Sequence, residues 1–432
     1  MKHRRWFTTL ALVGVLSIVA AACAGEEAPS GAEVDCNTVE FGCVQVGPDD
    51  PINVGVSQVI SGADATLGQD QVNGIKLALD HRDGTFDGTN GTVLDHEVEL
   101  TTEDDGCSAE GGQAAISALV ADQSVVGILG TSCSSGALGV GDTIASEKGV
   151  LLFSSSNTNP ALTAEGTHQP FYARTAHNDR IQGAIVAEFA LGELGATTAA
   201  TIADESPYTQ GLVAAFQQNF EAGGGTISGE EQVNSEDTDF KTPLRSLAEG
   251  GPDVMYFPIF VAACTLVIKQ ANEIMPDTDR IVSDGCLSSD TLKNAGADAE
   301  GVFASSPDPS GTASDFYADE FLPAYQDQFG TEPLSVFHAH AYDATNILLD
   351  AIEAVAIEND DGSLSIPRQA LRDEVFATSG YEGVIGTFTC TELGDCATDV
   401  SIGIYEAPAW PVEGGTGDET VYADIKSLDE VL

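Results

Sequence analysis

The sequence predicts an α/β protein of two doubly wound lobes, each built on a parallel sheet, with the chain crossing between the lobes more than once. Short β-branched, apolar runs alternate with amphipathic helical stretches from about residue 52 onward. The same alternation restarts after residue 174. The length of 432 residues also fits two to three domains of roughly 150 residues each.

The first series reads strand, helix, strand, helix, strand, helix, strand, which favours parallel strands joined by right-handed crossovers. The expected strands are residues 52–60, 97–101, 125–129 and 150–153. The expected helices carry Val72, Ile75 and Leu79, then residues 114–120, then Leu138, Val140 and Ile144.

The second series begins with a helix and continues the same rhythm. Helices are expected at residues 181–194, 211–222, 242–247 and 264–274, and strands at 198–203, 226–233, 254–260, 280–283 and 302–305. Two longer helical regions and two short strands follow, at residues 314–328, 337–356, 384–389 and 401–405. We therefore expect lobe 1 to comprise residues 51–175 and 308–378, and lobe 2 residues 176–307 and 379–432.

The composition excludes some classes of partner. The chain has 68 Asp and Glu against 16 Lys and Arg, for a formal charge of −52, while 42% of its residues are hydrophobic. The hydrophobic content is enough for a sizeable core. Because nucleic acid requires clustered Lys and Arg, the charge argues against nucleic-acid binding and against docking on anionic lipid.

The N-terminus has the pattern of an export signal. Lys2, Arg4 and Arg5 precede a short apolar run at residues 6–19, and three alanines then stand before Cys23. Small residues before a cysteine resemble the lipobox of bacterial lipoproteins, which predicts a signal peptide at 1–22 and a lipidated Cys23. Residues 23–50 are then expected to form a lipidated, acidic tether. The alternative is an ordinary signal peptide with a cysteine there by chance.

The other eight cysteines are an even number in an exported chain, which indicates disulfides. Two pairs are close in sequence, and the other four cysteines follow the carboxyl ends of expected neighbouring strands, two in each lobe. The expected pairings are Cys36–Cys43, Cys107–Cys133, Cys264–Cys286 and Cys390–Cys396.

Polar segments follow four expected strands, at the sheet edges where ligands of open α/β folds bind. They are residues 131–136, 154–158, 204–208 and 283–285. Hydroxyl and backbone N–H groups, with Ser134 opening a helix, suit a carboxylate. Asp284 suits an ammonium group, so the pattern favours a receptor for an α-amino acid. Strand-end Ser and Asp also serve as helix caps and turn residues, which is the alternative.

The sequence offers little for catalysis or metal binding. It contains no Gly-x-Ser-x-Gly motif, and His338 and His340 alternate within a helical pattern. Asp104 and Asp105 read as loop acids rather than calcium ligands. We expect no enzymatic activity, no cofactor and no metal.

Several short motifs together resemble the branched-chain amino-acid (Leu/Ile/Val) binding proteins, which are type I periplasmic binding proteins with a Venus-flytrap fold that serve ABC importers. The resemblance spans about residues 52–405. It rests on Ser61-Gly62, Cys107, Cys133-Ser134-Ser135, the segment 159–163, Tyr208 with Gly211, Asp239-Phe240, the segment 252–254 and the segment 341–344.

The resemblance implies roles for particular residues. Ser134, Ser156 and Thr158 fall on positions that bind the ligand carboxylate, and Asp284 falls on the acid that binds the amine, where the family usually has Glu. Tyr208 falls on a tyrosine at the junction of the lobes. Two further tyrosine positions fall on Leu67 and Phe260, which keeps the pocket apolar but removes hydroxyl groups.

The sequence therefore predicts an exported, lipid-anchored, monomeric receptor on the outer face of the cytoplasmic membrane. Its expected ligand is a small aliphatic or branched-chain amino acid, captured by lobe closure, and its expected partners are an ABC permease and ATPase. Three alternatives remain open at this stage: the same fold binding an amide, urea-like compound or other small carboxylate; an exported sensory module; and an exported hydrolase.

Overall fold

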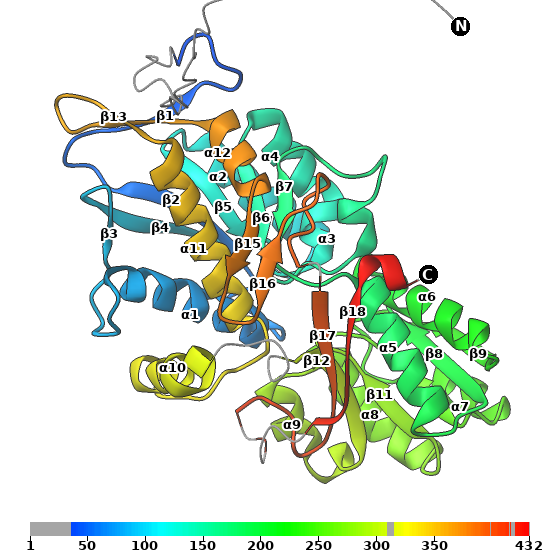
Figure 1. Cartoon of the computed structure of the whole chain (residues 1–432). Helices are drawn as coiled ribbons and strands as arrows, with labels where there is room; N and C mark the ends of the chain where they lie inside the picture. Colours follow the sequence, from blue (N-terminus) through cyan, green and yellow to red (C-terminus); the bar gives the residue numbers. More distant parts are fainter. Residues whose placement is uncertain (1–35, 309–314, 398, 414, 416–419, 432) are drawn as a thin grey trace, which may run out of the picture. The chain divides into compact units, whose positions relative to one another are not determined.

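A computed structural model describes residues 36–308, 315–397, 399–413, 415 and 420–431. The predicted signal peptide at residues 1–22 and the predicted lipidation site at Cys23 lie outside the described residues. The described part contains two separate large sheets, each flanked by helices, so the predicted α/β architecture is confirmed (Figure 1).

The first large sheet has six strands in the order β3-β4-β2-β5-β6-β7. Strands β2, β4, β5, β6 and β7 run parallel, and only the short β3 is antiparallel to its neighbour. The strands are β2 (Ile52–Gln58), β3 (Thr92–Val93), β4 (His96–Asp104), β5 (Val125–Gly130), β6 (Leu151–Ser154) and β7 (Tyr172–Arg174).

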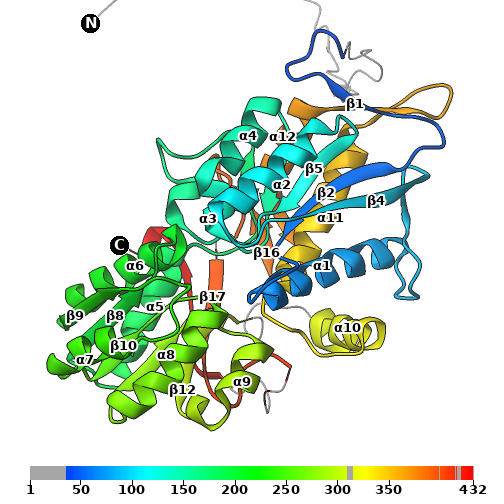
Figure 2. The same cartoon turned by 180° about the vertical axis from the view of Figure 1, so that it is seen from behind.

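Helices cover both faces of this sheet because its side chains alternate between two apolar clusters. One cluster joins Val126 and Leu129 of β5 to helices α1 and α11, and the other joins Val125 and Ile128 to α2 and α4 (Figures 1 and 2). The helices of this lobe are α1 (Ala65–Asp80), α2 (Ala109–Ala121), α3 (Ser134–Gly136), α4 (Asp142–Lys148), α10 (Leu322–Phe329), α11 (His338–Val355) and α12 (Arg368–Phe376).

The second large sheet has seven strands in the order β18-β17-β12-β11-β10-β8-β9. Strands β8 to β12 are parallel, whereas β17 and β18 are antiparallel additions at one edge. The strands are β8 (Thr198–Ala203), β9 (Thr226–Gln232), β10 (Val254–Tyr256), β11 (Asp279–Val282), β12 (Val302–Pro307), β17 (Asp399–Glu406) and β18 (Thr420–Ser427).

Helices also pack on both faces of the second sheet. Met255 points into a cluster with α7 and α8, and its neighbours Val254 and Tyr256 point into a cluster with α5 and α6. The helices are α5 (Asp179–Gly192), α6 (Pro207–Ala222), α7 (Lys241–Glu249), α8 (Val261–Ile274) and α9 (Ser289–Ala295). Helix α8 begins at Val261, three residues earlier than expected, because β10 ends at Tyr256.

Two small sheets differ from the sequence expectation. Residues 43–46 of the expected tether form β1 (Cys43–Val46), which pairs with β14 (Leu364–Pro367) beside β13 (Ile357–Glu358). The hairpin of β15 (Ser379–Glu382) and β16 (Thr387–Thr389) belongs to the apolar cluster of α1 and α11. It therefore packs with the first lobe, although the expected boundary assigned residues from 379 onward to the second.

All four expected disulfide pairings are present: Cys36–Cys43, Cys107–Cys133, Cys264–Cys286 and Cys390–Cys396. Cys264–Cys286 joins the helix after β10 to the loop after its neighbour β11. Cys107–Cys133 joins the loops after β4 and β5, which were expected to be neighbours but have β2 between them. These two disulfides therefore brace the carboxyl edges of both large sheets.

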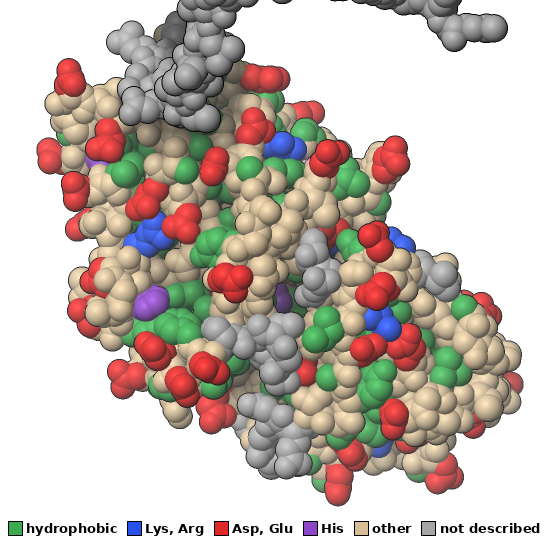
Figure 3. Space-filling view, in the orientation of Figure 1, with side chains coloured by type: hydrophobic (Ala, Val, Ile, Leu, Met, Phe, Trp, Pro, Cys, Tyr) green, Lys and Arg blue, Asp and Glu red, His purple; other side chains and the backbone are tan. Residues whose placement is uncertain are grey.

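The surface of the molecule is strongly acidic. In Figure 3, Asp and Glu side chains are spread over the visible face, and Lys and Arg are few. Among the described residues, no helix combines the length and the apolar character needed to cross a bilayer.

Candidate functional site

The hydroxyl groups predicted to bind a carboxylate lie at the carboxyl edge of the first large sheet. Ser134 begins the helical segment that follows β5, and its Oγ accepts a hydrogen bond from the backbone N–H of Asn159 at 3.3 Å. Ser156 follows β6, and its Oγ lies 2.7 Å from the carbonyl oxygen of Ser132. The hydroxyl of Thr158 is buried without a well-formed hydrogen bond among the described residues.

A buried arginine fixes the loop that carries Thr158. Arg174, at the end of β7, donates from Nη1 to the carbonyl oxygens of Asn157 at 3.0 Å and Asn159 at 2.9 Å. Its Nε is paired with Asp395 at 2.5 Å, and both side chains are almost fully buried. Thr158 therefore lies between two backbone groups that one guanidinium holds in place.

The predicted amine-binding acid lies across from this loop, in the second lobe. Asp284 follows β11 and is 4% exposed. Its Oδ1 accepts from Gln182 Nε2 at 2.7 Å, and its Oδ2 accepts from the Tyr208 hydroxyl at 3.2 Å. The Tyr208 hydroxyl also lies 2.7 Å from Ser283 Oγ, so the tyrosine is held directly beside the acid.

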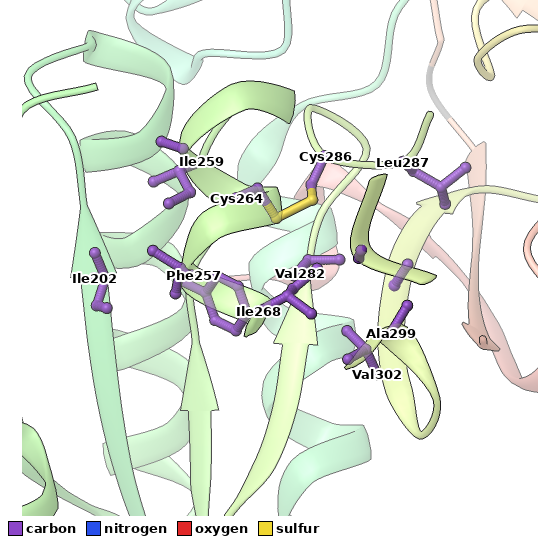
Figure 4. Packing of buried hydrophobic residues seen from close by; sticks show 14 of the residues in the cluster. Ile202, Phe257, Ile259, Cys264, Ile268, Val282, Cys286, Leu287, Ala299 and Val302 are labelled. Carbon is purple, nitrogen blue, oxygen red and sulfur yellow. A yellow bond between two sulfur atoms is a disulfide. The ribbon is translucent and has the colours of Figure 1, made fainter. Parts of the chain in front are cut away.

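The apolar residues predicted for the site lie in one cluster that draws on both lobes. Leu67 of α1 and Cys133 share it with Ile259, Cys264, Cys286 and Leu287 of the second lobe, and Phe260 packs against it. Figure 4 shows the second-lobe part, with the Cys264–Cys286 disulfide at its centre. The rings of Phe260 and Tyr208 have centroids 5.1 Å apart. The predicted apolar wall is thus continuous with Tyr208.

A second acid that the sequence analysis did not single out belongs to the same site. Asp179, the first residue of α5, is 0% exposed, and neither of its carboxyl oxygens has a well-formed hydrogen bond among the described residues. Burial raises its pKa well above the usual value; the charge of Asp284 raises it further, and a polar contact with Thr158 lowers it. Asp179 therefore lies between the predicted carboxylate-binding and amine-binding groups.

The ionisation of Asp179 is coupled electrostatically to that of Asp284. Burial raises the pKa of Asp284 to about 6, although the hydrogen bonds from Gln182 and Tyr208 act in the opposite direction. Because like charges in a dry site do not both ionise readily, the pair favours a state in which one of the two acids is protonated. Such a pair carries a net charge of −1, which one ammonium group neutralises.

A chain of hydrogen bonds links Asp284 to His177, which lies in one of the segments that cross between the lobes; these crossing segments form the hinge. His177 Nε2 lies 2.8 Å from Gln182 Oε1, and Gln182 in turn donates to Asp284. Burial lowers the pKa of His177 to about 4, so the imidazole is neutral and donates from Nε2. His177 also borders a cavity of about 60 Å³ that touches all three crossings between the lobes: Thr175 and His177, Pro307 and Asp308, and Ala397 and Val400.

The lobes are in contact in this structure. Asn159 Nδ2 of the first lobe donates to the carbonyl oxygen of Pro207, at the start of α6, at 2.7 Å. The hydroxyls of Thr66 and Ser288 lie 2.8 Å apart. The described residues therefore adopt a closed arrangement in which the site is buried.

The structure thus brings Ser134, Ser156, Thr158, Tyr208, Asp284, Leu67 and Phe260 to the junction of the lobes. Sequence reasoning missed Asp179 and Gln182, because an acid and an amide in the first turn of a helix are ordinary capping and surface residues. The described residues contain no cluster of three His, Cys, Asp or Glu side chains that could hold a metal ion.

Comparisons with known proteins agree with this fold. A family model described as periplasmic binding protein matches residues 51–401. The chain is 27% identical over 350 residues to a Leu/Ile/Val-binding protein homolog from Brucella melitensis, covering 80% of this chain and 89% of that one. It is also 27% identical over 334 residues to a leucine-, isoleucine-, valine-, threonine- and alanine-binding protein from Pseudomonas aeruginosa, covering 76% and 84%.

Among solved structures, a leucine binding protein from Thermotoga maritima superposes with a TM-score of 0.73 at 26% identity, covering 88% of this chain and 100% of that chain. This similarity confirms the type I periplasmic binding fold. Since the family model covers most of the length, the chain belongs to the periplasmic binding protein family.

Proposed function

We propose that this protein captures a small α-amino acid outside the cytoplasm and presents it to an ABC permease and its ATPase. Ser134, Ser156 and Thr158 bind the ligand carboxylate, and Asp284 together with Asp179 binds the α-ammonium. Leu67, Tyr208 and Phe260 enclose the side chain. A lipid on Cys23 tethers the receptor to the membrane.

The observation that carries the proposal is the incomplete hydrogen bonding of polar groups at the junction of the lobes, where Asp179 and Thr158 make a polar contact with each other. The Asp179 carboxyl oxygens and the Thr158 hydroxyl are buried without well-formed hydrogen bonds among the described residues. An unsatisfied buried hydroxyl or carboxyl group costs several kcal/mol. A zwitterion supplies a positive and a negative group at the same place, and so it satisfies both kinds of partner.

The expected mechanism is lobe closure. The carboxylate docks on the first lobe, and the second lobe then brings Tyr208 and Asp284 onto the ammonium. The ligand favours the closed state because only that state supplies both sets of contacts. The permease can then distinguish loaded receptors from empty ones by their shape.

A thermal-shift screen over the proteinogenic amino acids, their amides and small carboxylates tests the proposal. A ligand present at a hundred times its dissociation constant adds about 2.7 kcal/mol to the stability of the folded state. We expect at least one α-amino acid to raise the melting temperature. Stabilisation by amides or simple carboxylates alone would favour the same fold with a different ligand.

Asp284→Asn then tests the amine-binding role by titration calorimetry. The variant keeps the size and one acceptor but removes the charge, so we expect a loss of about 2–5 kcal/mol in binding free energy. Incubation of the protein with labelled amino acids is a separate check, and conversion of any of them to a product would favour the hydrolase alternative. Unchanged affinity would contradict the assignment of Asp284.

A further inference from the structure

Gln182 of α5 connects the hinge to the predicted amine-binding acid, and its amide is bonded at both ends. Its Nε2 donates to Asp284 Oδ1 at 2.7 Å, and its Oε1 lies 2.8 Å from Nε2 of His177. All three side chains are almost fully buried. Water therefore has little access to these hydrogen bonds, which strengthens them relative to bonds at the surface.

The groups around the amide nitrogen fix its orientation. Besides Asp284 Oδ1, Gln182 Nε2 lies 3.0 Å from the Oγ and 3.2 Å from the carbonyl oxygen of Ser305. The Ser305 hydroxyl donates to the carbonyl oxygen of Val282 at 3.2 Å, so toward Gln182 it offers only lone pairs. A rotated amide would place its own oxygen against three acceptors. The NH₂ group of Gln182 therefore faces Asp284.

The opposite end of the amide then requires a donor, and His177 supplies it. Burial lowers the pKa of His177 to about 4, so the imidazole is neutral and has a single N–H. Since Gln182 Oε1 is an acceptor, that N–H is on Nε2, and Nδ1 keeps a lone pair that has no partner among the described residues. The tautomer of His177 and the orientation of the Gln182 amide are therefore set together.

Asp284 receives a donor on each carboxyl oxygen. Gln182 donates to Oδ1, and the Tyr208 hydroxyl donates to Oδ2 at 3.2 Å. A carboxylate accepts both bonds, whereas a carboxylic acid carries a proton that competes with them. These contacts therefore favour the ionised acid at a buried position. In agreement, both hydrogen bonds lower the pKa of Asp284, which burial raises to about 6.

The alternative is a structural role, in which Gln182 only joins α5 to β12 through Ser305. The shortest contacts of the amide, however, are those with Asp284 and His177, and neither partner belongs to β12. His177 lies in the segment that crosses from β7 to α5, and Asp284 follows β11. The hydrogen bonds of Gln182 therefore run from a hinge segment to the acid that faces the ligand.

We propose that Gln182 is a positioning residue that keeps Asp284 ionised and directed at the α-ammonium of the ligand, and that His177 sets the orientation of the Gln182 amide. This inference rests on the proposed function, because it takes Asp284 as the amine-binding acid. It adds two residues that act through Asp284 rather than by touching the ligand. Ligand affinity, and the pH at which it is lost, then depend on a histidine in the hinge.

Calorimetric titration of Gln182→Met with the tightest amino acid, from pH 5 to pH 8.5, tests the positioning role. Methionine keeps the length of the side chain but donates no hydrogen bond. Without the donor, Asp284 binds a proton more readily. We therefore expect affinity at pH 7 to fall about tenfold, as for the loss of one hydrogen bond to a charged group. We also expect the pH below which affinity is lost to rise by about one pH unit.

Gln217→Met is the matched control. Gln217 of α6 is half-buried, and its Nε2 donates to Thr201 Oγ1 at 2.9 Å, so the substitution also removes one amide hydrogen bond. Neither residue belongs to the proposed site, and we expect this variant to bind with unaltered affinity and pH dependence. Melting curves establish that both variants are folded.

Two substitutions of His177 test the second half of the proposal without altering Gln182. His177→Phe keeps a ring beside Phe337, with which the imidazole is stacked at 6.3 Å between centroids, but removes the donor to Gln182. His177→Gln keeps a side-chain N–H donor. We expect the Phe variant to shift the pH dependence in the same direction as Gln182→Met, and the Gln variant to stay close to the unaltered protein.

Other ionisable groups face this chain of hydrogen bonds and are kept in every variant. They are Asp179, Tyr208 and Tyr256 around Asp284, and Arg174, Asp395 and His340 around His177. Because these groups are common to all the proteins compared, a difference in pH dependence between variants reports the contacts of Gln182.

Several results would overturn the positioning role. An equal loss of affinity at every pH in folded Gln182→Met would leave Gln182 a structural role only, and unchanged affinity would leave it none. The same pH dependence in His177→Phe and His177→Gln would remove His177 from the proposal. These results leave the proposed function intact, whereas the absence of amino-acid binding by the unaltered protein would contradict both.

Discussion

At the scale of single residues, the site depends on which of Asp179 and Asp284 is ionised. Both lie at the junction of the lobes, and each has a pKa raised first by burial. An α-ammonium binds to the ionised form of Asp284, so the ligand competes with a proton for the same carboxylate. The affinity is therefore expected to depend on pH near the pKa of about 6.

The direction in which affinity changes with pH follows from the linkage between ligand binding and proton binding. Below about pH 6 the free protein carries a proton on Asp284 that the ligand must displace, so affinity falls as the pH falls and is constant well above pH 7. Calorimetry at pH 6 in two buffers with different ionisation enthalpies is expected to show proton release on binding, and none at pH 8. Binding without proton release at pH 6 would contradict the role of Asp284.

Outside the site itself, Arg174 is the residue whose replacement we expect to destabilise the folded protein most. Arg174→Ala leaves Asp395 buried without its cation and frees the carbonyl groups on either side of Thr158. Breaking a buried pair in this way costs about 3–5 kcal/mol of unfolding free energy, measured by chemical denaturation. Arg82→Ala is the control, because its partners Asp350 and Glu353 are half-exposed and ion pairs at the surface contribute at most about 1 kcal/mol. A loss equal to the control would contradict this account of Arg174.

At the scale of secondary-structure elements, Gly211 of helix α6 offers a test of lobe closure. A Cβ atom on Gly211 would lie 2.8 Å from Asn159 Nδ2, the group that bridges the lobes to Pro207. Gly211→Ala is therefore expected to disfavour the closed state and to weaken ligand binding about tenfold. Stability is expected to be unchanged or slightly higher, since alanine is the better helix former.

Gly192→Ala in α5 is the matched control, because a Cβ atom there meets no other atom within 4 Å. Calorimetry and melting curves on both variants check the prediction. An unaltered affinity in Gly211→Ala would show that α6 and the loop at Asn159 do not need to approach for binding.

The elements also show what the sequence could and could not predict. The alternating pattern predicted the parallel strands, and the positions of Cys107 and Cys133 at carboxyl ends of strands predicted their pairing, although β2 lies between the two strands that were expected to be neighbours. The hairpin β15–β16 was assigned to the wrong neighbour, because its packing on Asp343 of α11 comes from a distant part of the chain. The role of Asp179 depends on burial between lobes, which no local pattern encodes.

At the scale of the whole molecule, buried acids control the response of stability to pH. Burial raises the pKa of Asp105 to about 6 and of Asp343 to about 7, above the ordinary value of 3.8 for an aspartate. Between pH 3.8 and these values the two carboxyl groups bind more protons in the folded state than in the unfolded chain, so they add to the unfolding free energy as the pH falls from about 7 to 5. Buried His177, whose pKa is lowered to about 4, acts in the opposite direction. The formal charge of −52 also decreases in magnitude over this range, which reduces self-repulsion.

Melting temperatures measured from pH 8 to pH 4 check this expectation, with a parallel series at low and high salt. Salt is expected to raise the melting temperature most at the higher pH, where the repulsion is greatest. A melting temperature that falls steadily from pH 8 to pH 5 would show that the buried histidines outweigh the buried acids, and would contradict a net stabilisation by those acids.

The central claim is that one ligand joins the two lobes through its carboxylate and its ammonium. A crystal structure of the protein with the tightest amino acid from the screen tests it most directly. We predict the carboxylate within hydrogen-bonding distance of Ser134, Ser156 and Thr158, and the α-ammonium between Asp179 and Asp284. A ligand bound away from these residues, for example in the hinge cavity beside His177, would contradict the account.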